Sequence, residues 1–138
     1  MVVSGIEGIA LLFGRLLFGG VLAFMGLNHF LQTDQMAGYA EHKGLPAPRL
    51  AVLASGGVLV LGGLSIVAGI FPVIGAIAVA GFLVSSGLLM HDFWAVPEDQ
   101  QQDELTQFLK NTVMAGGALT FAALASESWT FSLNIGLV

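Results

Sequence analysis

A single arginine inside a long apolar segment constrains this chain more than any other feature. Residues Gly5–Leu31 read GIEGIALLFGRLLFGGVLAFMGLNHFL, with Arg15 near the middle. As a helix, this segment would be about 40 Å long, enough to cross the roughly 30 Å hydrocarbon core of a bilayer. An arginine at that depth costs about 2.5–3.5 kcal/mol, so it normally faces a bundle interior, a wet cavity or a partner. Arg15 is therefore the first candidate functional residue.

The composition extends this interpretation to the whole chain. Hydrophobic residues make up 56% of the 138 residues and charged residues only 9%, which indicates an integral membrane protein. We expect a single membrane domain, 1–138, with no separate soluble catalytic module. The 4 Lys and Arg against 9 Asp and Glu do not suggest a nucleic-acid partner. Because the chain has no cysteine, disulfides, thiolate-bound Fe–S clusters and thiol redox chemistry are excluded.

Four apolar segments predict an all-α fold, a membrane-embedded four-helix bundle. The predicted spans are about 5–31, 50–70, 73–91 and 105–125. A short interfacial helix is expected between spans 1 and 2, with Thr33 as its N-cap and Gly44 as its stop. Pro97 is well placed as the first residue of the last helix, whose opening acidic residues are expected to face water.

Each predicted span carries one face of small residues. On the first span that face lies within about 40° of Arg15. Small residues let neighbouring helices approach closely in lipid, so these faces are predicted to pack inward and to turn Arg15 toward the bundle interior. The predicted faces are Gly8, Arg15, Gly19, Leu22, Gly26 and His29 on the first span; Ser55, Gly62 and Gly69 on the second; Ala76, Ala80, Val84 and Gly87 on the third; and Asn111, Ala115, Ala118, Ala122 and Ala125 on the fourth.

The distribution of basic residues predicts an orientation in the cell membrane. Lys43, Arg49 and Lys110 all lie in or beside the first and third connections between spans. The positive-inside rule therefore places those connections in the cytoplasm and both termini outside.

The ends of the predicted spans bring polar residues to one level on the side of those connections. This layer consists of Asn28, His29, His91, Asp92, Lys110 and Asn111. Arg15 lies deeper, with Glu7 and Glu127 as its nearest acidic candidates.

Three interpretations of the polar layer stay open. His29, His91 and Asp92 could form a metal set, but no motif fixes their spacing, and we expect no metal. The histidines could instead anchor helix ends at the headgroup level. The third interpretation is a pocket for a polar head group such as a quinone, with His29, His91 and Lys110 donating to its carbonyl oxygens.

Five segments together resemble the DoxX family of small four-helix integral membrane proteins. They are GRLLFGGVLAFMGLNHF around Arg15, KGLPAP, LGGLSIVAG, MHDFW and FLKNTVMAGGALTF. The resemblance covers most of the chain and implies a four-helix membrane bundle. It also implies a link to quinone-coupled oxidation of thiosulfate or to membrane complexes that resist oxidative stress. Family members often carry an acidic residue within the second span, where this chain has Leu59, so a partner for Arg15 is missing.

The expected function is that of a subunit or accessory of a quinone-linked redox system that does not catalyse a reaction alone. A quinone is the candidate cofactor, and the catalytic residues are unknown. The alternative is a lipid-binding or membrane-partner scaffolding protein, with a homo-oligomer as one form of partner, that uses its small-residue faces. On the ligand-binding interpretation, Arg15→Leu would insert and fold but lose its ligand or partner. The candidate ligand-binding residues are Arg15, His29, His91, Asp92, Lys110 and Asn111.

Overall fold

The computed structural model describes residues 2–137 as an almost entirely helical chain. Its helices are α1 (Gly5–Leu31), α2 (Thr33–His42), α3 (Pro48–Ala68), α4 (Pro72–Met90), the short 3₁₀ turn η1 (Phe93–Ala95) and α5 (Glu98–Leu124). The strands β1 (Val2–Val3) and β2 (Ser128–Trp129), two residues each, pair in parallel. Apart from this small patch, the prediction of an all-α chain is confirmed.

Among residues 2–137, three helices are long and apolar enough to cross a membrane. They are α1, α3 and the segment Pro72–Ala95 that contains α4, with hydropathies of 2.0, 2.3 and 2.2. Proline begins α3 and α4, because its missing N–H is not needed in a first helical turn. Pro97 directly precedes α5, whose first turns are polar and whose apolar residues come later. The chain is therefore an α-helical membrane protein by length and composition.

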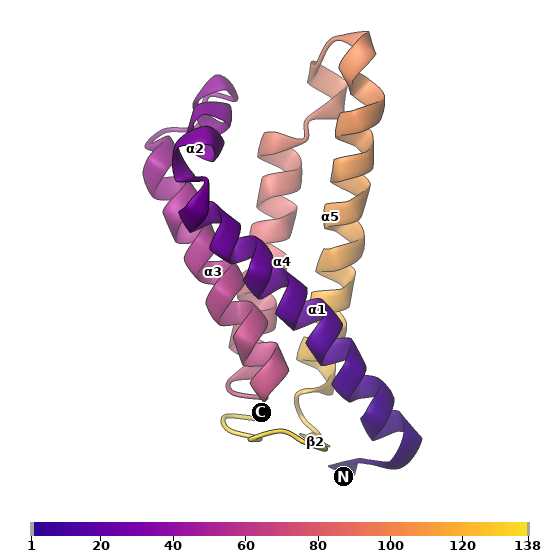
Figure 1. The fold of residues 1–138 in the computed structure, drawn as a ribbon. Helices are drawn as coiled ribbons and strands as arrows, with labels where there is room; N and C mark the ends of the chain where they lie inside the picture. The colour runs from indigo at the N-terminus through magenta and orange to yellow at the C-terminus, as the bar shows by residue number, and fades with distance from the viewer. Residues whose placement is uncertain (1, 138) are drawn as a thin grey trace.

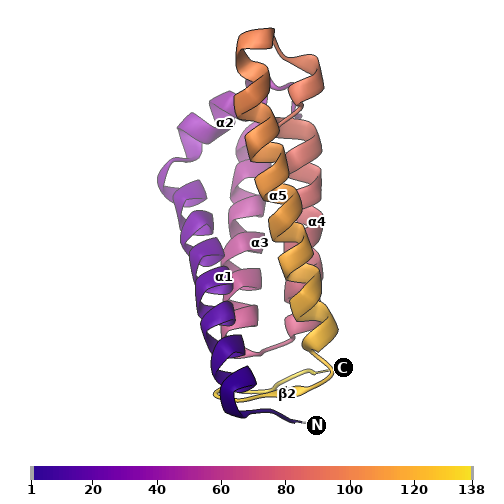
Figure 2. The same cartoon turned by 90° about the vertical axis from the view of Figure 1, so that its right-hand side faces the viewer.

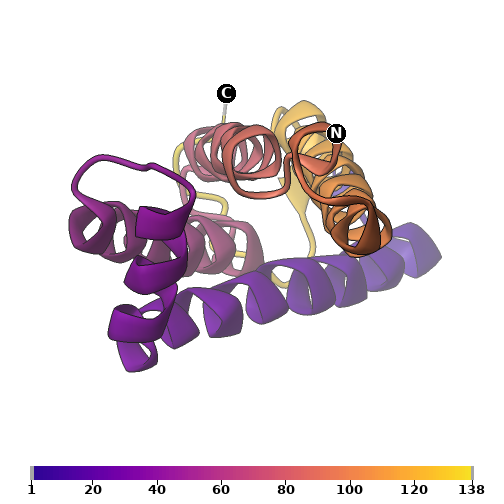
Figure 3. The same ribbon diagram turned by 90° about the horizontal axis from the view of Figure 1, so that it is seen from above.

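The four long helices form two antiparallel pairs (Figure 1). α1 packs along α3, α4 packs along α5, and contacts between α3 and α4 join the two pairs. α1 and α5 meet near the chain termini, where the rings of Phe18 and Phe121 lie 5.2 Å apart. Toward the end that carries α2, α1 diverges from α5 (Figures 1 and 3). This divergence leaves room between the pairs at the α2 end.

Glycines set how closely α1 and α3 approach. A Cβ atom built on Gly19 would lie 2.5 Å from the carbonyl oxygen of Gly63, and one built on Gly26 would lie 2.8 Å from that of Gly56. The two helices therefore touch backbone to backbone at two levels. The prediction that the glycine face of the first span packs inward is confirmed, since its buried residues include Gly8, Arg15, Gly19, Leu22, Gly26 and His29.

The small face predicted for the third span is only partly right. Ala76, Ala80 and Gly87 are buried, but Val84 is 51% exposed. α4 packs against α3 on one side and α5 on the other, so its buried stripe is centred on Val79 and Leu83 instead. Val84 lies just outside that stripe.

The segment after α5 closes the end of the bundle opposite α2 (Figure 2). The amides of Leu133 and Ile135 donate to the carbonyl oxygens of Ala68 and Gly69, each at 2.9 Å. The last carbonyls of a helix lack partners within it, so this segment caps α3. Trp129 is 1% exposed and packs in the core near this end. We call residues 126–137 the terminal cap.

Candidate functional site

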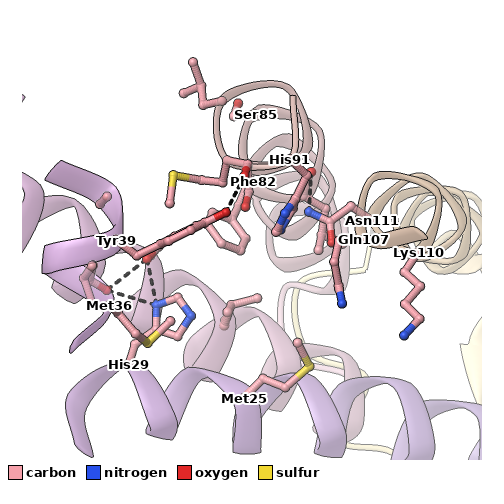
Figure 4. A pocket seen from close by; sticks show the side chains of 18 of the residues that line it. Met25, His29, Met36, Tyr39, Phe82, Ser85, His91, Gln107, Lys110 and Asn111 are labelled. Carbon is pink, nitrogen blue, oxygen red and sulfur yellow. Dashed lines mark hydrogen bonds between the residues drawn. The ribbon is translucent and has the colours of Figure 1, made fainter. Parts of the chain in front are cut away.

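A cavity of about 1170 Å³ lies between the two helix pairs at the α2 end. All five α-helices line it, and its lining is mostly apolar with a few polar side chains, as in sites for small molecules. Figure 4 shows side chains from α1, α2, α4 and α5 that line it. Those labelled are Met25, His29, Met36, Tyr39, Phe82, Ser85, His91, Gln107, Lys110 and Asn111.

The structure brings four of the six predicted ligand residues together. The cavity lining includes His29, His91, Lys110 and Asn111, whereas Asp92 and Arg15 lie outside it. Asn111 uses one amide hydrogen to donate to the carbonyl oxygen of Leu83 at 3.2 Å. Within residues 2–137, no three His, Asp or Glu side chains gather as a metal site would require.

His29 is fixed against α3 by one ring nitrogen. Its Nδ1 lies 3.2 Å from the carbonyl oxygen of Val52 and 2.9 Å from the Oγ of Ser55. The Ser55 hydroxyl itself donates to the Val52 carbonyl oxygen at 2.9 Å. The ring is buried, with 9% of the residue exposed, and it lies in a T-shaped arrangement with the ring of Phe82, with centroids 6.2 Å apart. His29 is therefore a rigid part of the cavity wall.

His91 belongs to a polar network that links three helices. Its Nδ1 lies 3.0 Å from Oε2 of Glu104, while Oε1 of the same carboxylate accepts from the hydroxyl of Tyr39 at 3.0 Å. The Tyr39 hydroxyl also lies 3.0 Å from the carbonyl oxygen of Met90. Burial raises the pKa of Tyr39, and the hydrogen bond and negative charge of Glu104 raise it further. Tyr39 therefore stays protonated as a donor.

Glu104 and Tyr39 were not among the predicted site residues. Glu104 was expected simply to face water with the other acids that open α5. A signal for it was present in the sequence, because it precedes Asn111 by seven residues, two helical turns, and so shares its face. Tyr39 lay within the predicted interfacial helix, but its partner could not be known without the tertiary structure.

A second link ties the segment after α2 to the end of α4. The Nζ of Lys43 lies 2.6 Å from Oδ1 of Asp92, and the Lys43 side chain is only 12% exposed. Burial lowers the pKa of Lys43, but the hydrogen bond to Asp92 and the negative charges of Asp92 and Glu104 raise it and leave the pKa above its ordinary value. Asp92, predicted as a ligand residue, thus has a charged partner outside the cavity.

Arg15 lies near the opposite end and binds main-chain oxygens. Its Nε donates to the carbonyl of Ile66 at 3.3 Å and its Nη2 to that of Val67 at 2.6 Å. Its Nη1 donates to the carbonyl of Thr130 at 2.9 Å, and Nη2 also donates to that of Phe131 at 2.9 Å. Arg15 therefore joins α1 to the end of α3 and to the terminal cap.

The surroundings of Arg15 stabilise its positive charge without a carboxylate partner. The carbonyls at the end of α3 carry the negative pole of the helix dipole. The guanidinium also lies 5.4 Å from the centre of the Trp129 ring, within the range of a cation–π interaction. Among residues 2–137, its side-chain hydrogen bonds go to carbonyl oxygens rather than to Glu7 or Glu127. The backbone thus supplies the buried partner that the sequence lacked.

The long apolar helices and the cavity between them define a helical membrane protein with a ligand-sized site. The family model for DoxX matches residues 10–92, more than half of the chain. This chain therefore belongs to the DoxX family. The matched segment runs from α1 through α4 and includes Arg15, His29 and His91. Comparisons with curated proteins and with solved structures found no match.

Proposed function

We propose that this DoxX protein binds an apolar molecule with a polar head group, such as a quinone, in the cavity between its helix pairs. In this role it serves a quinone-linked redox system as a subunit or accessory and does not catalyse a reaction alone. The observation that carries the proposal is the cavity itself, whose wall is mostly apolar. Its polar side chains include His29, His91, Lys110 and Asn111, which belong to the polar layer predicted at the ends of the spans. The redox context rests on the DoxX resemblance.

The proposal includes a four-span bundle, with residues 105–124 of α5 as the fourth span. Leu119 of α5 is 51% exposed and lies outside the cavity lining. Apolar side chains in that position suit lipid contact. α2 has a polar composition and lies at one end of the helices, as an interfacial helix would.

The same proposal orients the protein with α2 in the cytoplasm and both termini outside the cell membrane. Single cysteines are easily introduced because the chain has none. We expect Ser4→Cys to react with a membrane-impermeant maleimide in intact cells, and Glu41→Cys to react only after lysis, since both positions are exposed. The opposite labelling pattern would invert the orientation, and labelling of both in intact cells would contradict a membrane crossing by α1.

Ligand binding predicts a gain of stability that depends on the cavity. In mild detergent, free quinone at about 10 times its Kd should stabilise the protein by about 1.4 kcal/mol, seen as a higher Tm. Ser86→Phe, which places a ring at the cavity wall, should abolish the gain. Thr120→Phe, a matched change at an exposed position outside the lining, should preserve it. If no quinone co-purifies and added quinone leaves the Tm of the unsubstituted protein unchanged, the quinone proposal fails.

The lipid-binding alternative is favoured by one observation, the apolar lining and large volume of the cavity, which also suit an acyl chain. Mass spectrometry of the purified protein would support this alternative if it identifies a lipid that the unsubstituted protein binds and the Ser86→Phe variant does not. Scaffolding through the small-residue faces has less support, because Gly19 and Gly26 pack against α3 within the chain. Crosslinking in native membranes that recovers one dominant partner without redox activity would still favour it.

A further inference from the structure

The contacts of His29 decide which of its ring nitrogens carries hydrogen. The carbonyl oxygen of Val52 can only accept a hydrogen bond, and the Ser55 hydroxyl directs its own hydrogen to that carbonyl. Both neighbours therefore accept from Nδ1, which must carry the hydrogen. In the neutral ring Nε2 is then an acceptor. No hydrogen bond of Nε2 is found within residues 2–137, so this nitrogen remains for a ligand.

A carboxylate gives His91 the same tautomer, with its hydrogen on Nδ1. Oε2 of Glu104 can only accept when ionised, so Nδ1 of His91 donates to it across 3.0 Å. Nε2 of the neutral His91 ring is then an acceptor as well. The other oxygen of this carboxylate is held by Tyr39, which fixes the carboxylate in place. Glu104 is thus a positioning residue that sets the tautomer of a cavity histidine.

We propose that the cavity selects ligands whose head group donates an O–H, such as a phenol or a hydroquinone, over head groups that only accept. In their neutral state both histidine rings accept at Nε2, which is the reverse of the donor role expected from the sequence. Lys110 and Gln107, also in the lining, can donate to any ligand oxygen and so do not discriminate. A hydroxyl can accept from them and donate to a ring nitrogen, whereas the carbonyl of an oxidised quinone leaves that nitrogen unpaired.

The preference can be measured with two probes that differ in one hydrogen-bond donor. A long-chain 4-alkylphenol and its methyl ether have the same tail and ring, but only the phenol donates. In a buffer of about pH 8, where imidazole is ordinarily neutral, we expect the phenol to bind about tenfold more tightly to the purified full-length protein. Equal affinity for the two probes overturns this inference alone. Failure of both to bind overturns it together with the proposed function on which it rests.

Matched variants test the role assigned to Glu104. His29→Phe leaves His91 as the histidine of the lining and should retain a preference for the phenol of at least about threefold. Adding Glu104→Gln should remove the preference. The Tyr39 hydroxyl donates to the amide oxygen, so the amide nitrogen faces Nδ1 of His91, donates to it and moves the ring hydrogen to Nε2. Adding Tyr39→Phe to His29→Phe instead removes only the hydrogen bond between residue 39 and Oε1 of Glu104. This double variant should keep the preference for the phenol.

A spectroscopic readout separates this role from a structural one. In ¹⁵N spectra of labelled protein, Nε2 of His91 should resonate as an unprotonated nitrogen, and in Glu104→Gln as a protonated one. A folded Glu104→Gln variant that keeps both the unprotonated Nε2 signal and the preference for the phenol would overturn the assignment.

Discussion

Replacing Arg15 with methionine should lower the free energy of unfolding by about 3–5 kcal/mol and release the terminal cap. The new side chain is similar in length but leaves four carbonyl oxygens without their donor, two at the end of α3 and two in the cap. Each buried acceptor left unpaired costs about 1–3 kcal/mol, with partial relief as water reaches the cap. Thermal unfolding in detergent measures the stability, and limited proteolysis between residues 126 and 137 measures the release.

Arg49→Met is the matched control. Arg49 pairs with Asp34 at the surface and its side chain is 64% exposed, so its loss should cost about 1 kcal/mol or less. The anchoring role is contradicted if Arg15→Met has the Tm of the unsubstituted protein and its terminal cap stays resistant to proteolysis. Loss of ligand without loss of stability in that variant would instead support the ligand role predicted from the sequence. If Arg15 is an anchor, the folded variant should bind ligand normally, because the residue lies outside the cavity.

Gly19→Ala should destabilise the protein by about 2–3 kcal/mol. The added Cβ would lie 2.5 Å from the Gly63 carbonyl oxygen and 2.9 Å from Cγ2 of Val67. Since one of these atoms is backbone, α1 and α3 must move apart, which loosens their packing at both glycine levels. The measurement is the unfolding transition in a fixed detergent, followed by circular dichroism.

The neighbouring Gly20 provides the control, because a Cβ there meets nothing within 4 Å. Gly20→Ala should be neutral or stabilise by up to about 1 kcal/mol through the better helix propensity of alanine. Equal effects at the two positions would mean that the helices do not approach as closely as the structure places them.

Local sequence patterns were enough to predict the helices and much of their packing. The 3.6-residue period identified the buried face of α1, since only one stripe of that helix is made of small residues around Arg15. Pro97 was predicted to open the last helix and directly precedes α5, because proline restricts the backbone of its own and the preceding residue. Val84 was misassigned because a helix packed on two sides buries a wider, shifted stripe.

The candidate site was predictable only in part. His29, His91, Lys110 and Asn111 were placed at one level by counting residues from the span ends, and the cavity unites them. Counting could not show that the Glu104 carboxylate lies between His91 and Tyr39, because that depends on how α2, α4 and α5 are arranged in space. The hydrogen-bond role of each histidine depends on the same contacts and was therefore out of reach.

The sequence by itself determined that this is a helical membrane protein, which face of α1 turns inward and that Arg15 cannot face lipid. Those conclusions follow from hydropathy, helical period and the cost of burying a charge. Only the tertiary structure decided what Arg15 binds, because its partners are main-chain carbonyls and such groups occur at every residue. Two of them lie 115 and 116 residues away, in a cap that returns to the bundle after the last helix.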